Sequence, residues 1–599
     1  MSNEDNKKDN GGSTDHKSVS VTINELDRSS TDTDSNNEKN HSRDHADLNG
    51  YVPEADVKLV TKSGNIITAN SQVVRTHAFD NDQESDSIDD NIFLDPEIAE
   101  FYRNLYEDAQ YEGRHVFDPN LTWSKEEERK IVWKLEWRCC LLACVMFMAL
   151  QLDRGNIGQA LSDNMLTDLN LTTNDYNLGQ TLFYISFLSA ELPSQLISKK
   201  LGPDRWIPMQ ITLWSIVAIC QSRLSGLGSF IGTRVLLGLL EGGFIPDAIL
   251  WMSYFYTGKE LPIRLSYFWT ALSITQILAS LLAFALLRMR GVNGWEGWRW
   301  LFLIEGIITL LIGLSAFFLM PASPVQTKTW FRPNGWFTDR EERIVVNRVL
   351  RDDPSKGDMH NRQAITLKML WQGISDYDMW PLYLIGLVSF IPLSTPGSYL
   401  TLTLRSLGFS PFNTNLLTIP NHFMHIIFLL IITRLTEYFN ERSYIACLQP
   451  LWLIPCLGVL RWWSGSLENV WGTYAVLTTL LSAPYIHSIL VGWCSRNSNT
   501  VSNRTISAAI YNMFVQAGGI TASNIYRKDD LPKYKRGNTQ LFAISFASLG
   551  IILLTKAYYV WRNKTRAKIW EAMSKEEQDD YRATTDHKGN KRLDFRFVH

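Results

Sequence analysis

The chain has 599 residues, of which 45% are hydrophobic and 20% are charged, and its mean hydropathy is -0.10. These averages are typical of a large soluble protein, and a net charge of -3 argues against a nucleic-acid binder, which needs a clustered basic face. The averages mislead because the apolar residues are segregated. Stretches of about 17 to 25 mostly uncharged residues recur from Trp137 to Trp561, and that length crosses a bilayer core. The sequence therefore predicts a polytopic membrane protein with polar tails.

The N-terminal tail, residues 1–136, is predicted to be a disordered cytoplasmic segment. As far as about Phe117 it is rich in Asp, Asn, Ser, Lys and Thr, and such a composition cannot bury enough apolar surface to offset its chain entropy. A short helix over 124–138 then brings basic and Trp residues to the membrane interface.

Twelve membrane spans are predicted, six on each side of a polar segment. They lie near 137–158, 176–197, 206–224, 229–252, 266–287, 299–320, 380–402, 415–433, 444–462, 470–491, 506–526 and 540–561. The predicted organisation is an all-α membrane protein with a six-helix half at 137–320, a cytoplasmic central loop at 321–379, a second six-helix half at 380–561 and a cytoplasmic tail at 562–599. Two such halves are typical of a transporter built from repeats.

Basic residues flank the first span, fill the central loop and follow the last span, so the positive-inside rule places all three segments in the cytoplasm. The predicted location is the plasma membrane. One loop, 527–536, is basic although it is predicted to face outward; it either attracts anions or is merely solvated. Pro392, Pro396, Gly397 and Pro420 are predicted to break spans seven and eight.

Charged residues inside spans are the candidates for function, because a charge at bilayer depth is costly unless it meets a partner or water. Span one contains Asp153 next to Arg154, and span four contains Arg234 and Glu241. The seven-residue spacing puts the last two on one helix face, with Gly238 between them where another helix can approach closely.

These residue types fit a proton-coupled anion carrier. An arginine replaces the water that the anion loses, and a buried carboxylate beside it links proton occupancy to anion occupancy. Asp153 with Arg154, and Arg234 with Glu241, are predicted to supply both parts. The alternatives are that Asp153 and Arg154 form an interfacial pair at the end of the span, and that Arg234 and Glu241 only lock helices together.

Span eleven contributes Asn512 and Gln516 as candidate hydrogen-bonding groups for the substrate, while its Gly518–Gly519 pair is predicted to serve helix packing. The histidines inside spans, His422, His425 and His487, could join a proton path, but they are more typical of helix–helix hydrogen-bond donors and are left out of the predicted site. The seven cysteines show no metal-ligand spacing, and no phosphate-binding loop, HExxH or GxSxG motif is present. We therefore expect no enzyme activity, metal or cofactor.

Four strings, LDRGNIGQA, RVLLGLLEGGFIP, GWRWLFLIEG and YNMFVQAGGITASNIYRKDDLPKYKRGN, resemble the fungal allantoate permease family of anion:cation symporters, within the major facilitator superfamily. The strings NDYNLGQT, GGFIPDAILWMSYFYTG, RDDPSKGDMHNRQ and KRLDFRFVH are most similar to the branch of that family that carries sulfonates and inorganic sulfur anions. The resemblance implies that Arg154 binds the anion and that Glu241, with Asp153, carries protons.

The expected function is proton-coupled uptake of a small anion, a sulfonate or other sulfur-containing anion first. A carboxylate such as allantoate or a vitamin acid is the alternative substrate, and a non-transporting nutrient sensor is the alternative function. The expected partners are the anion, the proton and the lipid bilayer, without nucleic acid, and the chain is expected to function as a monomer.

Overall fold

The computed structural model describes residues 58–60, 66–68, 91–258, 260–357, 367–439, 441–498, 501–585 and 589–599. Most of the predicted disordered tail therefore lies outside the described residues. Within it, β1 (Lys58–Val60) and β2 (Ile66–Thr68) form a short antiparallel pair.

The part of the tail between residues 91 and 117 is folded. Helix α1 (Pro96–Asp108) begins at Asp95, whose side chain accepts a hydrogen bond from the backbone of Glu97. The apolar face of α1 packs on α11 (Asp339–Asp352), and the Tyr106 hydroxyl donates to the Pro354 carbonyl at 2.8 Å. Burial raises the pKa of the Tyr102 phenol in this cluster to about 12. The prediction of disorder is thus wrong for this stretch, which folds because aromatic rings supply the buried surface that aliphatic residues lack here.

The first half of the membrane region contains the following helices: α2 (Lys125–Leu135), which runs through a π-helical turn into α3 (Leu141–Ala160), then α4 (Met165–Asp168), α5 (Thr173–Leu201), α6 (Pro203–Cys220), α7 (Leu227–Glu241), α8 (Phe244–Ser253), α9 (Leu261–Leu286) and α10 (Gly297–Leu319). The connecting segment contains α11 and α12 (Leu367–Ile374).

The second half contains α13 (Trp380–Ser389), α14 (Ile391–Ser398), α15 (Leu400–Ser406), α16 (Pro411–Leu417), α17 (Ile419–Phe439), α18 (Ser443–Ala446), α19 (Leu448–Trp462), α20 (Val470–Leu481), α21 (His487–Ser498), α22 (Val501–Ala522) and α23 (Lys535–Glu571), and α24 (Lys575–Thr584) follows it. Helices occupy all the predicted spans. Seven helical segments of the described chain are long and apolar enough to cross a membrane. The other five ranges hold helices that are less apolar or broken, which is consistent with twelve spans.

Several spans are interrupted where the sequence predicts a break or a close approach. Span seven bends by 40° at Tyr399, next to Pro396 and Gly397, and has a further turn residue at Phe390 beside Pro392. Span eight continues through Thr418, which keeps helical dihedrals, so no break is seen at Pro420. Span four, predicted as one helix, is also broken: α7 ends at Glu241 and α8 begins after Gly243, whose φ of 87° favours glycine. A side chain at Gly243 would collide with Ser194 of α5, so the break allows α5 to pack closely.

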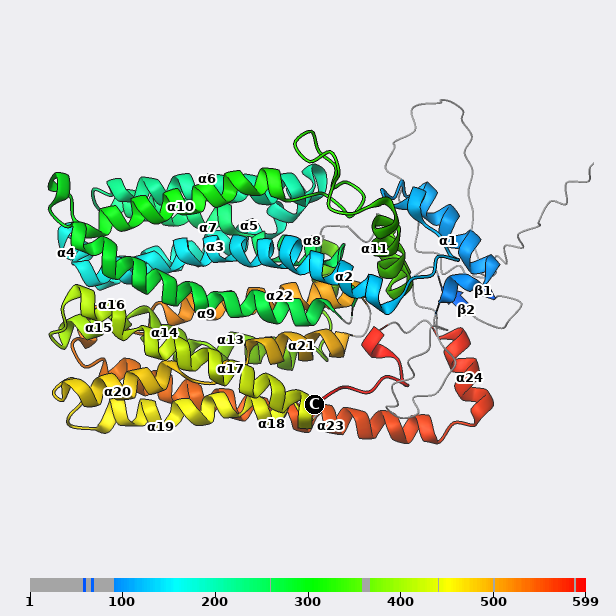
Figure 1. Cartoon of the computed structure of the whole chain (residues 1–599). Coiled ribbons are helices and arrows are strands. Elements are labelled where there is room, and N and C mark those ends of the chain that lie inside the picture. Colours follow the sequence, from blue (N-terminus) through cyan, green and yellow to red (C-terminus); the bar gives the residue numbers. More distant parts are fainter. Residues whose placement is uncertain are drawn as a thin grey trace, which may run out of the picture. The chain divides into compact units, whose positions relative to one another are not determined.

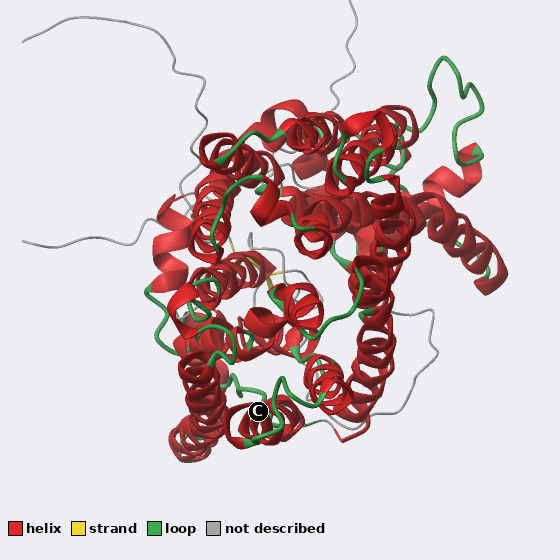
Figure 2. Cartoon of the chain, turned by 90° about the vertical axis from the view of Figure 1, so that its left-hand side faces the viewer, coloured by secondary structure: helices red, strands yellow, loops and turns green. Residues whose placement is uncertain are grey.

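The two halves lie side by side, with their helices running roughly parallel (Figure 1), and most of them are seen along their axes in Figure 2. We call the end that carries α1, α11 and α24 the tail end, and the end that carries α4 and the α15–α16 connection the loop end. Both described tails therefore lie at the same end as the central segment, as predicted.

The C-terminal tail is folded against the tail end of the second half. Phe597 is buried, and Asn563 exchanges two hydrogen bonds with its backbone. Asn497 of α21 likewise exchanges two with the backbone of Val598. The segment 589–599 is thus tied to both α21 and α23.

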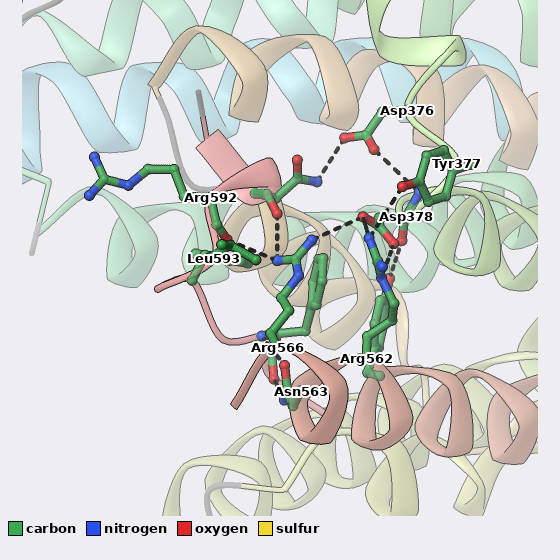
Figure 3. A network of polar contacts seen from close by, with 12 residues as sticks. Asp376, Tyr377, Asp378, Arg562, Asn563, Arg566, Arg592 and Leu593 are labelled. Atoms are coloured by element: carbon green, nitrogen blue, oxygen red, sulfur yellow. Dashed lines mark hydrogen bonds and ion pairs between the residues drawn. The ribbon is translucent and has the colours of Figure 1, made fainter. Parts of the chain in front are cut away.

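Asp378, just before α13, is the centre of the ionic network shown in Figure 3. Arg562 donates to its two carboxylate oxygens at 3.0 and 2.8 Å, and Arg566 contacts the carboxylate at 3.3 Å. Arg566 also donates to the Asn590 carbonyl at 2.7 Å. Asp378 therefore joins the start of the second half to its last helix and, through Arg566, to the C-terminal tail.

Asp378→Asn is expected to lower the unfolding free energy by about 3 kcal/mol, because it leaves the buried guanidinium of Arg566 without its anion. Asp529→Asn, which disrupts the exposed Asp529–Arg536 pair, is expected to leave the unfolding free energy nearly unchanged. Thermal unfolding of the two variants in detergent compares them directly. Equal melting temperatures would show that the network contributes nothing.

Candidate functional site

The central contact of the first half is an ion pair between α3 and α7. The Nε–H of Arg154 donates to Glu241 Oε2 at 2.6 Å. Glu241 is fully buried, whereas 18% of the Arg154 side chain is exposed. Glu241 Oε1 and Arg154 Nη2 have no hydrogen-bond partner among the described residues. The pair thus has both N–H groups of Nη2 and one carboxylate oxygen without a partner among the described residues.

Aromatic rings and a helix break hold this pair in place. The Arg154 guanidinium lies 4.5 Å from the ring centre of Phe187 and 5.6 Å from that of Phe183, within range of cation–π attraction. A Cβ at Gly238 would lie 2.4 Å from the Phe183 carbonyl oxygen, so this glycine brings α5 close to α7, as predicted. Glu241 is the last residue of α7, and broken helices are typical of sites at the centre of transporters.

Asp153 does not pair with Arg154, contrary to the expected arrangement. Adjacent residues of a helix point about 100° apart, and Asp153 is fully buried beside Trp214 of α6 and Thr309 of α10. It also lies seven residues before the end of α3, about 10 Å along the helix. The interfacial alternative is therefore wrong for Asp153, which is an interior residue.

Arg234 is also buried, but its bonded partner differs from the predicted one. Its Nη2–H donates to Gln221 Oε1 at 2.8 Å, while Glu241 acts on it only as a nearby charge. Arg234 and Glu241 thus share α7 without a bond between them, and the ion pair of the site is Arg154–Glu241. Arg234 contributes positive potential from the loop-end side of the site.

The candidate amides of α22 lie on the opposite half. Asn512, Gln516 and Gly519 are spaced i, i+4 and i+7, so they share one helix face. That face meets the first half, because a Cβ at Gly519 would lie 3.0 Å from the Tyr184 ring of α5. Both amides are half-buried and have no hydrogen bond to a described residue. They therefore lie on the helix face of α22 that meets α5 at Tyr184.

Tyr184 was not singled out by its sequence, which shows only an aromatic run, yet it connects the two groups of site residues. It lies within electrostatic range of both Arg154 and Arg234 and packs against Gly519. The glycines of α22 serve packing, as predicted: a Cβ at Gly518 would lie 2.3 Å from the Leu387 carbonyl oxygen of α13.

His487 of α21 contacts the Tyr511 hydroxyl of α22 at 3.3 Å through Nδ1, which confirms the predicted helix–helix contact. The rings of Trp269, Phe390 and Tyr485 surround it. His487 thus belongs to an aromatic cluster in which Trp269 comes from the first half.

Known proteins match both this fold and this sequence. Residues 143–523 match the family model of the Major Facilitator Superfamily. The chain belongs to the major facilitator superfamily. It is a membrane transporter of the major facilitator type.

A relative and two solved structures accord with that membership. The uncharacterized transporter YIL166C of Saccharomyces cerevisiae is 47% identical over 518 residues, which cover 86% of this chain and 95% of the relative. The xylose transporter XylE from E. coli, in a partially occluded inward-open conformation, has a TM-score of 0.52 at 15% identity, over 70% of this chain and 97% of its own. A bacterial homologue of the human lysosomal transporter Spinster, inward-facing and occupied, has a TM-score of 0.51 at 14% identity, over 70% and 96%.

The two halves of the transporter are joined by hydrogen bonds at the loop end. Asn177 of α5 donates to the Tyr526 carbonyl at 2.7 Å and accepts from the Tyr399 hydroxyl. Asn524 donates to Thr181 at 2.8 Å, and Asn415 donates to Ser162 at 2.9 Å. Among the described residues, the hydrogen bonds between the two halves lie toward the loop end, and none joins the halves at the tail end. The described conformation is therefore closed at the loop end.

The double change Asn177→Ala with Tyr399→Phe is expected to open the loop end. It removes buried hydrogen bonds worth about 2 kcal/mol together, which shifts a two-state equilibrium by roughly 30-fold. Spin labels at the exposed loop-end residues Ser225 and Ser406, one in each half, should show a longer distance in a larger population.

Gln180→Ala is the matched control, because Gln180 lies on the same helix but donates only to Tyr176 within it. It should leave the distance distribution unchanged. An unchanged distribution in the double variant would show that these bonds do not hold the loop end closed.

Proposed function

We propose that the transporter takes up a small anion together with protons, and that the anion is a sulfonate or another sulfur-containing anion. The observation that carries the proposal is the Arg154–Glu241 pair, in which a partly exposed cation is held by a fully buried carboxylate. An anion entering between the halves competes with that carboxylate for the guanidinium.

Protonation of Glu241 provides the coupling in this proposal. A proton on the carboxylate removes its charge, so that Arg154 is free to bind the anion with its planar set of donors. Proton and anion together neutralise the site. The loaded carrier can then reorient, whereas an unbalanced charge at this depth would cost several kcal/mol.

The remaining site residues have supporting roles in the proposal. Asn512 and Gln516 hydrogen-bond the substrate from the second half, and Arg234 adds positive potential. The strings that resemble the sulfur-anion branch of the allantoate permease family favour a sulfonate. A carboxylate such as allantoate or a vitamin acid is the second candidate, because an arginine fork matches both groups.

We further propose that both tails face the cytoplasm in the plasma membrane and that the transporter acts as a monomer. Basic residues beside the first and last spans support this orientation by the positive-inside rule. With the tails inside, the closed loop end faces outward, and the described conformation is an inward-facing one.

Purified protein in liposomes tests the function. We expect an inward proton gradient to drive uptake of labelled isethionate, a small sulfonate, and an uncoupler to abolish it. Sulfate and allantoate are tested in parallel to separate the substrate classes. If the protein binds one of these anions but moves none, the sensor alternative replaces the transporter proposal for that panel.

A further inference from the structure

A second buried carboxyl group lies behind the anion site. Glu305 of α10 is fully buried, and neither of its carboxylate oxygens has a hydrogen-bond partner among the described residues. Asp153 of α3 is fully buried as well, and its charge acts on Glu305. The helices α3 and α10 pack against each other, which brings the two carboxyl groups into one interior region.

This region is separate from the side of α3 that carries Arg154. Arg154 points toward Phe183, Phe187 and Glu241, while Asp153 lies on the face toward α6 and α10. The Trp214 indole and the Thr309 hydroxyl lie close enough to Asp153 to act on its carboxyl group. Both groups carry polar hydrogen atoms that suit a carboxyl site.

The charges around the two carboxyl groups do not balance two negative charges. Glu241 and Arg234 are the other charged groups that act on Asp153, and no described cation acts on Glu305. Two adjacent carboxylates without a bonded cation are strongly unfavourable in a medium of low dielectric constant. We therefore expect the two carboxyl groups to hold at least one proton between them in this conformation.

Asp153, Glu305 and Glu241 lie at different distances from the loop end of their helices. Asp153 lies about 10 Å from the loop-end terminus of α3, and Glu305 lies eight residues, or about 12 Å, from the loop-end start of α10. Glu241 lies 14 residues, or about 21 Å, from the loop-end start of α7. The pair is thus nearer the loop end than Glu241, and the charge of Glu241 acts on Asp153.

We propose that Glu305 and Asp153 form a proton-holding pair on the loop-end side of Glu241, from which a proton passes to the Glu241 carboxylate. The proton leaves a carboxyl oxygen of the pair and is bound by a carboxylate oxygen of Glu241, which frees Arg154 for the anion. This inference rests on the proposed proton-coupled function and adds Glu305 as a further residue of the proton path.

Infrared titration of the purified protein tests the pair without any transport. The absorption band of protonated carboxyl groups should persist in the wild type well above the pH at which exposed carboxyl groups ionise. Glu305→Gln should remove intensity from this band, whereas Glu296→Gln, which changes the carboxylate paired with Arg299 at the start of the same helix, should not. A band unchanged by Glu305→Gln would overturn the proposal.

Transport measurements then test the role of the pair. Glu305→Gln should reduce gradient-driven accumulation of isethionate at least about 10-fold, while exchange of labelled for unlabelled isethionate stays within about 2-fold of the wild type. Glu305→Asp, which keeps a carboxyl group, should restore part of the accumulation. Coupled accumulation equal to the wild type in Glu305→Gln would contradict the proposal.

The two tests also separate this inference from the proposed function. If the wild type moves no isethionate but the infrared band depends on Glu305, the proposed transport of this substrate fails and the proton-holding pair remains. If the wild type accumulates isethionate and neither measurement responds to Glu305→Gln, the pair fails and the proposed function remains.

Discussion

Replacing Arg154 with lysine is expected to reduce proton-driven uptake of isethionate by at least about 100-fold. The Nε–H of Arg154 is engaged by Glu241, while its buried Nη2 has no partner among the described residues, and we expect the rest of the guanidinium to bind the anion. Lysine keeps the charge but presents it as a single point on a flexible stem, so it cannot hold a carboxylate and an anion in one plane. A loss of about 3 kcal/mol in anion binding corresponds to that reduction.

Two further variants separate anion binding from folding. Arg461→Lys changes an exposed arginine that donates to Thr539, and uptake should stay within about 2-fold. The double variant Arg154→Gln with Glu241→Gln removes both members of the buried ion pair, so neither is left without its partner, and it should fold and still fail to take up isethionate. Uptake by Arg154→Lys close to the wild-type rate would remove Arg154 from the anion site.

The membrane helices could be predicted from sequence because length and hydropathy determine which segments cross a bilayer. The predicted break in span seven was confirmed at Tyr399, because Pro396 removes a backbone donor there, whereas span eight continues past Pro420. The break at Gly243 has no such local cause, since glycine occurs in many intact helices. It becomes visible only when α5 is in place against it.

The folded stretch at 91–117 was missed because composition was averaged over a long polar tail. Its buried residues are mainly aromatic and are separated by charged ones, so they form an apolar face only on a helix. Their partner surface, including Val346 and Leu350 of α11, lies more than 200 residues away in the sequence. Nothing near α1 in the sequence signals that contact.

The site residues were found by one signal, a charge inside an apolar run, but their pairing was not. Sequence proximity suggested Asp153 with Arg154, whereas consecutive helix positions point in different directions. The bonded pair, Arg154 with Glu241, joins residues 87 positions apart. Pairing depends on how α3, α5 and α7 pack, which no local pattern reveals.

A charge inside an apolar run also occurs at three carboxyl groups that were not among the predicted site residues. Glu191, Asp247 and Glu305 are buried inside the first half like Glu241. The Arg154 charge acts on Glu191, and Asp247 lies beside Ser198, nearer the tail end. Buried carboxyl groups thus recur through the depth of the first half, from Glu305 to Asp247, whereas the described spans of the second half bury no acidic residue.

Among these buried carboxyl groups, Glu241 is the one that bonds Arg154. Glu241→Gln is therefore the most informative change for the coupling mechanism. Glutamine keeps the shape of the side chain but carries no charge, so it mimics the protonated carboxyl group at every pH. Because the wild-type carboxylate competes with the anion for Arg154, isethionate binding should weaken as pH rises. In Glu241→Gln, binding should stay tight and independent of pH, and gradient-driven accumulation should fall at least about 10-fold.

Calorimetric titration with isethionate over a pH series measures binding, and exchange of labelled for unlabelled isethionate in liposomes measures reorientation of the loaded carrier. Exchange should survive in Glu241→Gln. The neutral glutamine gives the anion-loaded site the same net charge that protonation of Glu241 gives it in the wild type. Glu468→Gln, which removes the exposed partner of Lys533, is the control and should leave both measurements unchanged.

If Glu241→Gln keeps the pH dependence of binding and the full gradient-driven accumulation, competition at Arg154 is not the source of coupling. The proton must then act through a carboxyl group that does not touch Arg154, and Glu305 with Asp153 becomes the first such group to change.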